Sequence, residues 1–502
     1  MARFAIAAGD PVTAEAAATA LRAGGGAVDA AIAGALAACV AEPVLASLLG
    51  GGFMMARDAD GRSHLLDFFV QTPGRKVSAA EMDFRAIEAD FGETKQEFHI
   101  GAASIAAPGV AVGLAEAHAR FGRIPFPELA APAVAAAKNG TPLTAYQAGV
   151  MEIVRPIFAA TPETLATFGD GGKLLGAGDL YRNEALADVI ETYAHEGARF
   201  CQEGEVASAL LSLDGGCLTA ADLKAYGATW RAPLVEARGG ARLRLNPAPS
   251  LGGTLVAFAL RLIDRGAGPA DIARAFAATS RARLATDLNR QPMTGSARML
   301  APDLAELYRS EIAGQKAATR GTTHISVIDG AGAGAAITLS NGAGSGLIVP
   351  GTGLMPNNML GEEDLNPGDW HEWTPDTRLS SMMAPMAVEW PDGGLAMLGS
   401  GGSNRIRTAL AQVAARMIDR NQRLEDAVAA PRVHVEGAGP KVDFEDRLSE
   451  GDRAALLAAY PEAQPWGADS MFFGGVHAVR RDPKGGFEAA GDARRAGATR
   501  LG

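Results

Sequence analysis

The chain has 502 residues, 48% of them hydrophobic, and no long polar or repetitive tract, so it is long enough for roughly three average domains and can bury a large core. Acidic residues outnumber basic ones by 57 to 46, and the resulting net charge of -11 argues against nucleic acid or an anionic membrane as a partner. Three irregularly spaced cysteines, Cys39, Cys201 and Cys217, are too few for a disulfide framework or a zinc site, so we expect no metal.

The first ten residues lack the basic segment and the apolar stretch of a secretory signal. The most apolar run, residues 30–49, contains Glu42 and Pro43 and is followed by three glycines, which argues against a membrane span. The sequence therefore predicts a cytoplasmic protein.

Small and apolar residues at helical spacing predict two helices within residues 14–40, joined at the glycine run 24–26. A β-hairpin is predicted over residues 50–69, with its turn at Asp60-Gly61. Helical spacing then recurs through the middle of the chain, at residues 112–120, 127–137, 185–196, 221–226 and 255–265.

The pattern changes at residues 322–329, where apolar and polar residues alternate and many are β-branched. A glycine-rich turn and residues 336–339 follow, which predicts a second hairpin. Further strands are predicted at 386–390, 395–398 and 472–479, with a helix over 406–421. Such a mixture is typical of a layered α/β fold.

Gly321 precedes Thr322 at the start of this second hairpin. Threonine is a weak nucleophile unless a base takes its proton, and its own α-amine can do so once the residue becomes a chain terminus. A glycine before it tolerates the strained backbone that self-cleavage requires. Taken locally, Gly-Thr-Thr before a strand is also a common turn, so this pattern alone leaves both interpretations open.

The order of several short motifs resembles the γ-glutamyltransferase family over nearly the whole chain. The motifs are GGGAVDAA at residues 24–31, the glycine run before Phe53, APGV at 107–110, Tyr226 in its leucine-lysine-alanine-tyrosine segment, PAPSLGG at 247–253, TTHISVID at 322–329, LSSM at 379–382 and GSGGS at 399–403. The resemblance implies a four-layer αββα sandwich of the N-terminal-nucleophile hydrolase type. It also implies one precursor that is cut between Gly321 and Thr322 into a large subunit, 1–321, and a small catalytic subunit, 322–502. The two would stay interlocked as a heterodimer, alone or as a dimer of heterodimers.

The resemblance further assigns catalytic roles. Thr322 matches the nucleophile, and Thr338 matches a second threonine whose hydroxyl hydrogen-bonds it, although the intervening turn is two residues shorter here. Gly401, Gly402 and Ser403 match the segment whose backbone N–H groups hold the oxyanion, and the donor pair is either Gly401 with Gly402 or Gly402 with Ser403.

In the substrate site, Ser380 and Ser381 match a serine pair that binds a carboxylate. Other positions depart from the family pattern. Phe69 stands where an arginine grips the α-carboxylate of the γ-glutamyl group, so γ-glutamyl binding should be weaker unless Arg75 or another residue substitutes. Around the α-amino group, Ser340 replaces an asparagine, Met359 a glutamine and Glu362 an aspartate.

Two other patterns in the sequence are typical of functional sites. The glycines of residues 330–334 lack dinucleotide-binding spacing and lead into a strand, which argues against a Rossmann site. His324, two residues after Thr322, is either a general base or a structural histidine bonded within the hairpin, and the structural role is favoured.

The implied activity is transfer of a γ-glutamyl or similar acyl group from a glutathione-like amide to water or to an amino-acid or peptide acceptor, through a threonyl acyl-enzyme and without a cofactor. One alternative is an acylase for glutaryl or other non-γ-glutamyl amides, which Phe69 favours. Another is an uncleaved, catalytically silent relative that only binds ligands.

Overall fold

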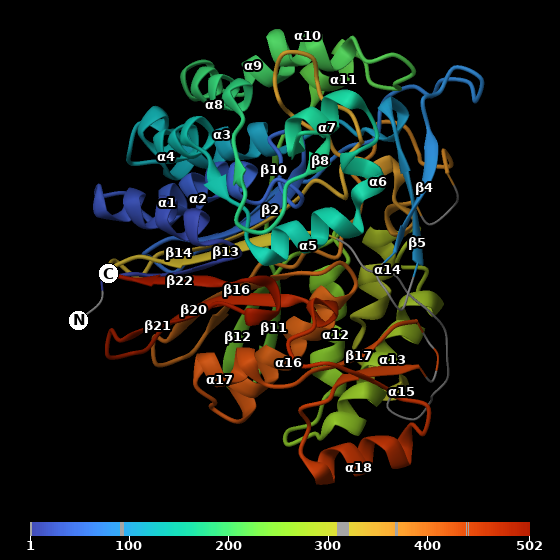
Figure 1. Cartoon of the computed structure of the whole chain (residues 1–502). Helices are drawn as coiled ribbons and strands as arrows, with labels where there is room; N and C mark the ends of the chain where they lie inside the picture. Colours follow the sequence, from blue (N-terminus) through green and yellow to red (C-terminus); the bar gives the residue numbers. More distant parts are fainter. Residues whose placement is uncertain (1–2, 91–94, 309–320, 367–369, 438, 440) are drawn as a thin grey trace.

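Two antiparallel β-sheets lie face to face at the centre of the molecule, and helices cover the outer face of each sheet (Figure 1). The computed structural model describes residues 3–90, 95–308, 321–366, 370–437, 439 and 441–502. Buried apolar side chains fill the space between the sheets and the spaces between each sheet and its helices. This arrangement confirms the predicted α/β fold with four layers in the order αββα.

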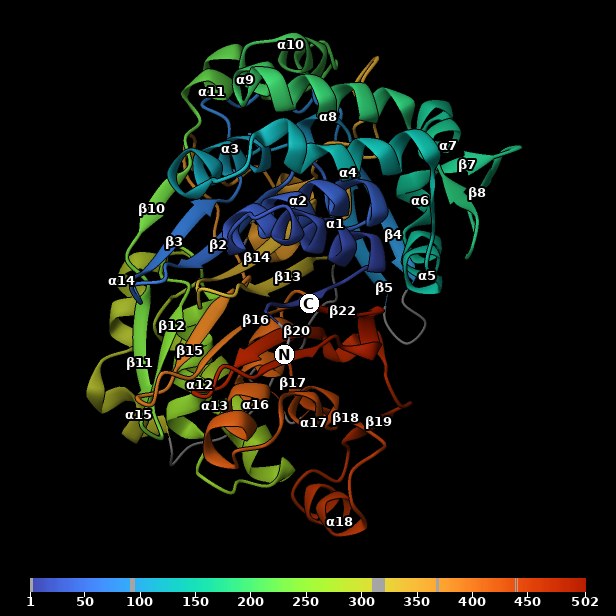
Figure 2. The ribbon, with the colours of Figure 1, turned by 90° about the vertical axis from the view of Figure 1, so that its left-hand side faces the viewer.

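The first sheet contains both predicted hairpins, which pair with each other so that Thr338 lies opposite Phe53. Its strands, in spatial order, are β10 (Thr229–Arg231), β3 (Ser63–Phe68), β2 (Gly51–Arg57), β14 (Gly334–Ser340), β13 (Thr323–Ile328), β1 (Ala5–Ala8) and β22 (Ala498–Leu501). Because β1 pairs with β22, both ends of the chain lie at the same side of this sheet, as Figure 2 shows.

The second sheet lies against the first. Its strands, in spatial order, are β11 (Leu234–Arg238), β12 (Ala241–Leu245), β15 (Met386–Glu389), β16 (Leu395–Gly401), β20 (Gly475–Arg481) and β21 (Phe487–Ala490). The strand predicted from residue 472 begins three residues later, because η4 (Met471–Phe473) forms a 3-10 turn and Gly474 follows it with φ 74°.

Alanine-rich helices cover the first sheet. Every residue of α2 (Ala27–Ala41) is buried, and α1 (Pro11–Arg22) packs beside it, because small side chains allow close packing. The other predicted helices of this half are confirmed as α3 (Val110–Phe121), α4 (Phe126–Asn139), α8 (Glu184–Glu196) and α11 (Ala220–Ala225). Shorter helices complete the layer: α5 (Ala145–Ile153), α6 (Arg155–Phe158), α7 (Pro162–Phe168), α9 (Arg199–Gln202) and α10 (Glu205–Leu211).

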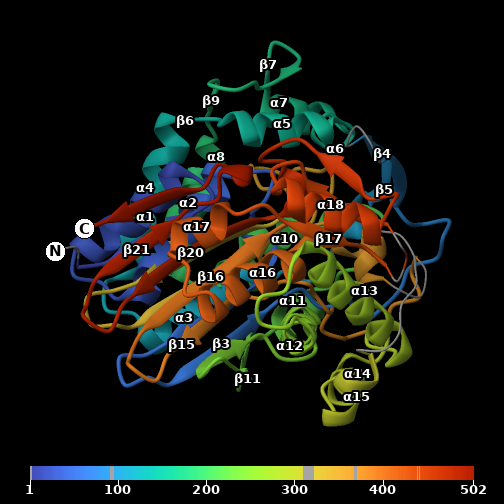
Figure 3. The same ribbon diagram turned by 90° about the horizontal axis from the view of Figure 1, so that it is seen from below.

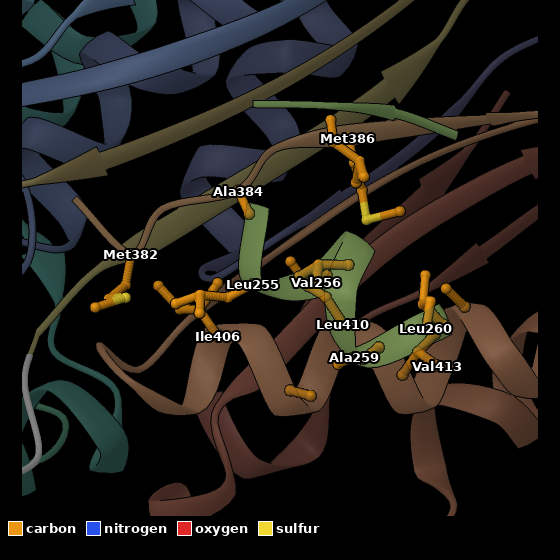
Figure 4. Close-up of a cluster of buried hydrophobic side chains, with 14 of the residues drawn as sticks. Leu255, Val256, Ala259, Leu260, Met382, Ala384, Met386, Ile406, Leu410 and Val413 are labelled. Carbon is orange, nitrogen blue, oxygen red and sulfur yellow. The ribbon is translucent and has the colours of Figure 1, made fainter. Parts of the chain in front are cut away.

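The helices α12 (Gly252–Leu262) and α16 (Arg405–Asp419) pack against the second sheet and against each other, and Figure 3 shows them from below. In Figure 4, Leu255 and Ala259 of α12 lie close to Ile406 and Leu410 of α16. Both helices confirm predicted ones, shifted by up to three residues. Further helices surround them: α13 (Pro269–Ala285), α14 (Pro292–Met299), α15 (Pro302–Tyr308), α17 (Leu424–Ala429) and α18 (Glu450–Ala459).

The remaining elements are short. They are β4 (Arg85–Asp90) with β5 (Lys95–Ile100), β6 (Thr141–Pro142) with β9 (Leu180–Tyr181), β7 (Gly169–Asp170) with β8 (Lys173–Leu174), the sheet of β17 (Val433–Val435), β18 (Val442–Glu445) and β19 (Gln464–Trp466), and the 3-10 turns η1 (Ala102–Ser104), η2 (Met359–Gly361), η3 (Glu363–Leu365) and η5 (Ala493–Arg495). Within the described ranges, no helix has the length and apolar composition needed to cross a bilayer.

Both sheets contain strands from before and after Gly321. In the first sheet, the hairpin β13–β14 lies between β2 and β1, and β22 pairs with β1 at the edge. In the second sheet, β11 and β12 precede Gly321 in sequence, whereas the four strands beside them follow it. A cut after Gly321 would therefore leave two chains that share both sheets.

Candidate active site

Thr322 lies immediately before β13, at the point where the predicted cleavage would occur. Its side chain is 5% exposed, and its Oγ1 donates to the carbonyl oxygen of Gly321 at 2.8 Å. Ser340, the last residue of β14, donates to the same oxygen from its own hydroxyl at 2.9 Å. Two hydroxyl groups thus converge on the carbonyl of the Gly321-Thr322 peptide.

The strand register explains this arrangement. Thr323 pairs with Leu339, so the next position along places Thr322 opposite Ser340, at the open end of the hairpin. The backbone N–H of Gly342 donates to Ser340 Oγ at 3.1 Å, which leaves the hydroxyl hydrogen directed at Gly321. The sequence predicted Ser340 only as a contact for a substrate amine.

Thr338 does not occupy the predicted position beside Thr322. It lies opposite His324 in the hairpin, and its Oγ1 is 2.7 Å from His324 Nδ1. Along the hairpin, Thr338 lies two residue pairs further from the cleavage point than Ser340, on the same face. The predicted bond between Thr338 and Thr322 is therefore replaced, in this structure, by the bond between Thr338 and His324.

His324 is fully buried, and both of its ring nitrogens have partners. Nε2 lies 2.8 Å from the Ser326 hydroxyl, and Gly399 on β16 leaves the space that the ring occupies. Burial, reinforced by the nearby His477, holds the pKa of His324 well below its usual value, so the ring stays neutral. These contacts fit the predicted structural role.

The glycine run before Phe53 brings β2 and the following loop against the hairpin. A Cβ atom at Gly50 would lie 2.5 Å from the carbonyl oxygen of Ser340, and one at Gly52 would lie 2.5 Å from that of Thr338. No larger residue fits at either position. The close approach places Phe69, just after β3, beside the end of β14.

The predicted oxyanion segment follows β16. Gly401 still pairs with Gly475 in the sheet, and a Cβ there would lie 2.1 Å from the carbonyl oxygen of Thr322. Gly402 and Ser403 have positive φ values of 120° and 50°, which turn the chain into α16. Among the described residues, nothing accepts a hydrogen bond from the backbone N–H of either, and the N-terminus of α16 adds partial positive charge. Gly402 and Ser403 are thus the pair free to bind an oxyanion.

Ser381 and Ser380 point to different cavities. Ser381 lines the cavity beside Thr322, whereas Ser380 lines a neighbouring cavity of about 480 Å³. The loop that carries them is fixed by the segment before α12, because the Ser250 hydroxyl donates to the Ser381 carbonyl at 2.9 Å and Asn246 Nδ2 donates to the Met383 carbonyl at 2.9 Å. Only Ser381 of the predicted pair lies beside Thr322.

Glu362 and Met359 come from the loop that follows β14. The side chain of Asn358 accepts from two backbone N–H groups of this loop, and Asn366 donates to the carbonyl of Glu362 at 2.8 Å. Glu362 is 3% exposed, and its carboxylate lies against Gly342, where a Cβ would come within 2.9 Å of Oε1. A carboxyl group is therefore held close to Ser340.

Phe69 is 1% exposed and stacks on Phe53, with ring centroids 5.5 Å apart. Neither Arg75 nor Arg378 takes the place of the missing arginine. Arg75 is exposed, and Arg378 donates to the backbone carbonyl of Phe69 and to the Tyr226 hydroxyl, outside the cavity beside Thr322.

The cavity beside Thr322 has a volume of about 40 Å³. Apolar and polar groups contribute about equally to its wall, and within the described part of the chain no arginine or lysine lines it. The lining residues are Phe69, Gly321, Thr322, Ser340, Met359, Glu362, Leu365, Ser381, Met382, Met383, Ser403 and Ile406. Seven of the predicted site residues therefore meet here, namely Phe69, Gly321, Thr322, Ser340, Glu362, Ser381 and Ser403.

Two buried acids behind Thr323 were not predicted. Thr323 Oγ1 and Thr13 Oγ1 both donate to the carboxyl group of Glu42. Burial, with a smaller contribution from the charge of Asp10, raises the pKa of Glu42 to about 8, and burial raises that of Asp10 to about 6. Nothing in the sequence around Asp10 and Glu42 indicates this pairing, because Asp10 caps the start of α1 and Glu42 follows the end of α2.

Comparisons with known proteins relate the whole chain to one family. The family model described as Gamma-glutamyltranspeptidase matches residues 13–501. The chain is 30% identical to the glutathione hydrolase proenzyme of Pseudomonas aeruginosa, over 98% of this chain and 93% of the relative, and 29% identical to an acylase ACY 1 proenzyme of Pseudomonas sp. (strain V22), over 96% and 90%. The crystal structure of cephalosporin acylase from Bacillus halodurans has the same fold, with a TM-score of 0.86 at 22% identity over 99% of this chain and 96% of that one. The chain therefore belongs to the gamma-glutamyltranspeptidase family of enzymes, which hydrolyse amides or transfer their acyl groups.

Proposed function

We propose that this protein is a self-cleaving acylase in which Thr322 first cuts the chain after Gly321 and then serves as the nucleophile toward amide substrates. The observation that carries the proposal is the convergence of Thr322 and Ser340 on the carbonyl oxygen of Gly321. The family relatives named as proenzymes support a precursor that is processed.

In the first step, Thr322 Oγ1 attacks the carbonyl carbon of Gly321, and the acyl group moves from nitrogen to oxygen. Ser340 donates a hydrogen bond to the oxyanion that forms. Water then hydrolyses the ester, which leaves a carboxylate on Gly321 and a free amine on Thr322. Residues 1–321 and 322–502 become the two subunits of a heterodimer with shared sheets.

In the second step, the α-amine of Thr322 accepts the proton of its own hydroxyl, and the oxygen attacks the substrate amide. The N–H groups of Gly402 and Ser403 stabilise the tetrahedral oxyanion, and the amine leaves. Water or an acceptor amine then releases the acyl group. A metal or organic cofactor has no part in these steps.

The acyl group that fits best lacks a carboxylate. A γ-glutamyl or glutaryl donor presents an anionic head, and burying that head without a cation is costly. Phe69, Met359 and Met382 line the cavity, and among the described residues no arginine or lysine does. We therefore favour uncharged or amine-bearing acyl groups over both anionic ones.

A γ-glutamyl substrate is the second candidate, and Glu362 is the observation that favours it. A buried carboxyl group beside Ser340 suits an ammonium group, which both γ-glutamyl and 4-aminobutyryl donors carry. The γ-glutamyl and 4-aminobutyryl donors therefore share the amine and differ only in the α-carboxylate.

A panel of anilides with matched chain length separates these candidates. We expect kcat/KM to be higher for butyryl and 4-aminobutyryl anilides than for the glutaryl and γ-glutamyl anilides. Preference for either anionic donor would contradict the proposed specificity. An intact, uncut chain without activity on all four would instead favour a silent binding protein.

A further inference from the structure

Arg495 is a buried arginine whose charge lacks a carboxylate partner among the described residues. It is 2% exposed, and it donates from Nη1 to the Tyr146 hydroxyl at 2.8 Å and from Nη2 to the Met471 carbonyl at 3.2 Å. Its neighbour Arg494 is equally buried but pairs with Glu445 at 2.6 Å and Asp492 at 3.0 Å. Because an unpaired buried cation is unfavourable, the position of Arg495 suits an anion that arrives later.

Three glycines make room for this side chain. Cβ atoms at Gly401, Gly402 and Gly475 would lie 3.3, 3.2 and 2.6 Å from atoms of Arg495. The same Gly401 position is 2.1 Å from the carbonyl oxygen of Thr322. The end of β16 thus brings the guanidinium close to the proposed cleavage point.

A small cavity of about 20 Å³ lies between Arg495 and Gly321. Apart from Arg495 and Tyr146, mostly apolar side chains and glycine line it. Gly321 also lines the cavity beside Thr322, so it separates the two. The Tyr146 hydroxyl accepts from Arg495, which leaves its own hydrogen to donate, and burial raises its pKa so that it stays protonated. The guanidinium and the phenol O–H, set in an otherwise apolar wall, are suited to bind one carboxylate.

We propose that Arg495 and Tyr146 form a carboxylate receptor and that its ligand is the new carboxylate of Gly321. The proposal rests on the self-cleavage proposed above. Hydrolysis breaks the bond between the Gly321 carbonyl carbon and Thr322 Oγ1, water supplies the second carboxylate oxygen, and the protons go to Thr322 Oγ1 and to the Thr322 amine or solvent. The product occupies the acyl cavity until it moves. A short shift into the receptor empties that cavity for substrate.

A substrate carboxylate on the leaving amine has the same chemistry, so the test must separate the two sources. Wild type, Arg495→Gln, Arg495→Lys and Tyr146→Phe are compared, with Arg494→Gln as the matched control. The accessibility of residue 321 is measured by carboxypeptidase digestion of the native cleaved protein, followed by intact mass. KM is measured for an amide whose leaving amine carries a carboxylate and for its methyl ester.

We expect the end at Gly321 to be trimmed at least ~10-fold faster in Arg495→Gln than in wild type, as loss of a charge-assisted contact predicts. The trimming rates of Tyr146→Phe and Arg495→Lys should lie between those of wild type and Arg495→Gln. Arg494→Gln should lower the melting temperature and leave the end at Gly321 protected. In a thermodynamic cycle, Arg495→Gln should lower the melting temperature more in the cleaved protein than in the uncleaved Thr322→Ala background.

Three outcomes would overturn the assignment of Gly321 as ligand. If trimming is unchanged and only KM for the carboxylate-bearing amide rises, the receptor serves the substrate. If neither changes and the two backgrounds lose stability equally, Arg495 is structural. If Arg495→Gln stays uncut although Thr322 is intact, Arg495 acts in the cleavage itself. An uncut wild type would instead contradict self-cleavage, which intact mass reveals before the other measurements.

Discussion

The hydroxyl of Ser340 lies 2.9 Å from the carbonyl oxygen of Gly321 and donates to it, although 19 residues separate the two in sequence. The hairpin creates this contact by placing Ser340 opposite Thr322. A residue that the sequence placed in substrate binding is thereby positioned for an earlier event, the cut that would free Thr322.

Ser340→Ala should slow self-cleavage by about 10² to 10³-fold, because loss of one donor to an oxyanion has an effect of that size. Ser340→Thr keeps the hydroxyl and should retain most of the rate. The time course of fragment appearance on denaturing gels measures both. Equal rates for Ser340→Ala and wild type would show that the contact has no part in cleavage.

Phe69→Arg should lower KM for γ-glutamyl anilide by roughly 10-fold or more, because a guanidinium in a shielded site pairs strongly with the α-carboxylate. Without bound substrate, Phe69→Arg should be less stable than wild type, since the arginine replaces a buried ring that stacks on Phe53. Phe69→Leu, which removes the ring without adding charge, is the control. If γ-glutamyl turnover by Phe69→Arg is unchanged or lower, this position is not the missing carboxylate contact.

The pH dependence of activity should follow the α-amine of Thr322 and not His324. A free α-amine has an ordinary pKa of about 8, so kcat/KM should rise as pH increases toward that value. His324 stays neutral throughout, because burial and His477 hold its pKa well below the usual value. His324→Gln should therefore lower the melting temperature and leave the midpoint of the profile unmoved. A shifted midpoint would give His324 a direct role as base.

Glu42→Gln should stabilise the protein at alkaline pH. The pKa of Glu42 is raised to about 8 in the folded state, chiefly by burial and then by the charge of Asp10, against 4.5 for an ordinary glutamate. Between those values the unfolded chain loses the proton and the folded chain keeps it, so stability falls as pH rises. The glutamine variant should lack this slope and melt at least a few degrees above wild type at pH 8 to 9. Parallel melting curves from pH 5 to 9 would contradict the raised pKa.

Periodicity predicted most of the framework, because the hairpins and long helices have strong local patterns. The boundaries moved by a few residues where tertiary contacts decide them. α12 begins at Gly252, for example, because Gly252 and Gly253 let it approach the backbone of Met382 and Asn246. Such approaches depend on partners far away in sequence, which local spacing does not reveal.

The site was predicted through motif order more than through chemistry. Motifs placed Thr322, Ser381 and Glu362 in one cavity, but they could not decide the hydrogen-bond partners within it. Thr338 was matched to a position beside Thr322, whereas strand register pairs it with His324. Arg495 gave no signal at all, since a charged pair near the end of a chain usually lies on the surface.

Intact mass analysis of the purified protein, alongside Thr322→Ala, tests the central claim most directly. The account predicts two fragments in the wild type, residues 1–321 and 322–502, and a single uncut chain in the variant. A wild-type protein that remains one chain of 502 residues after prolonged incubation would contradict self-cleavage at Gly321-Thr322 and the threonine mechanism built on it.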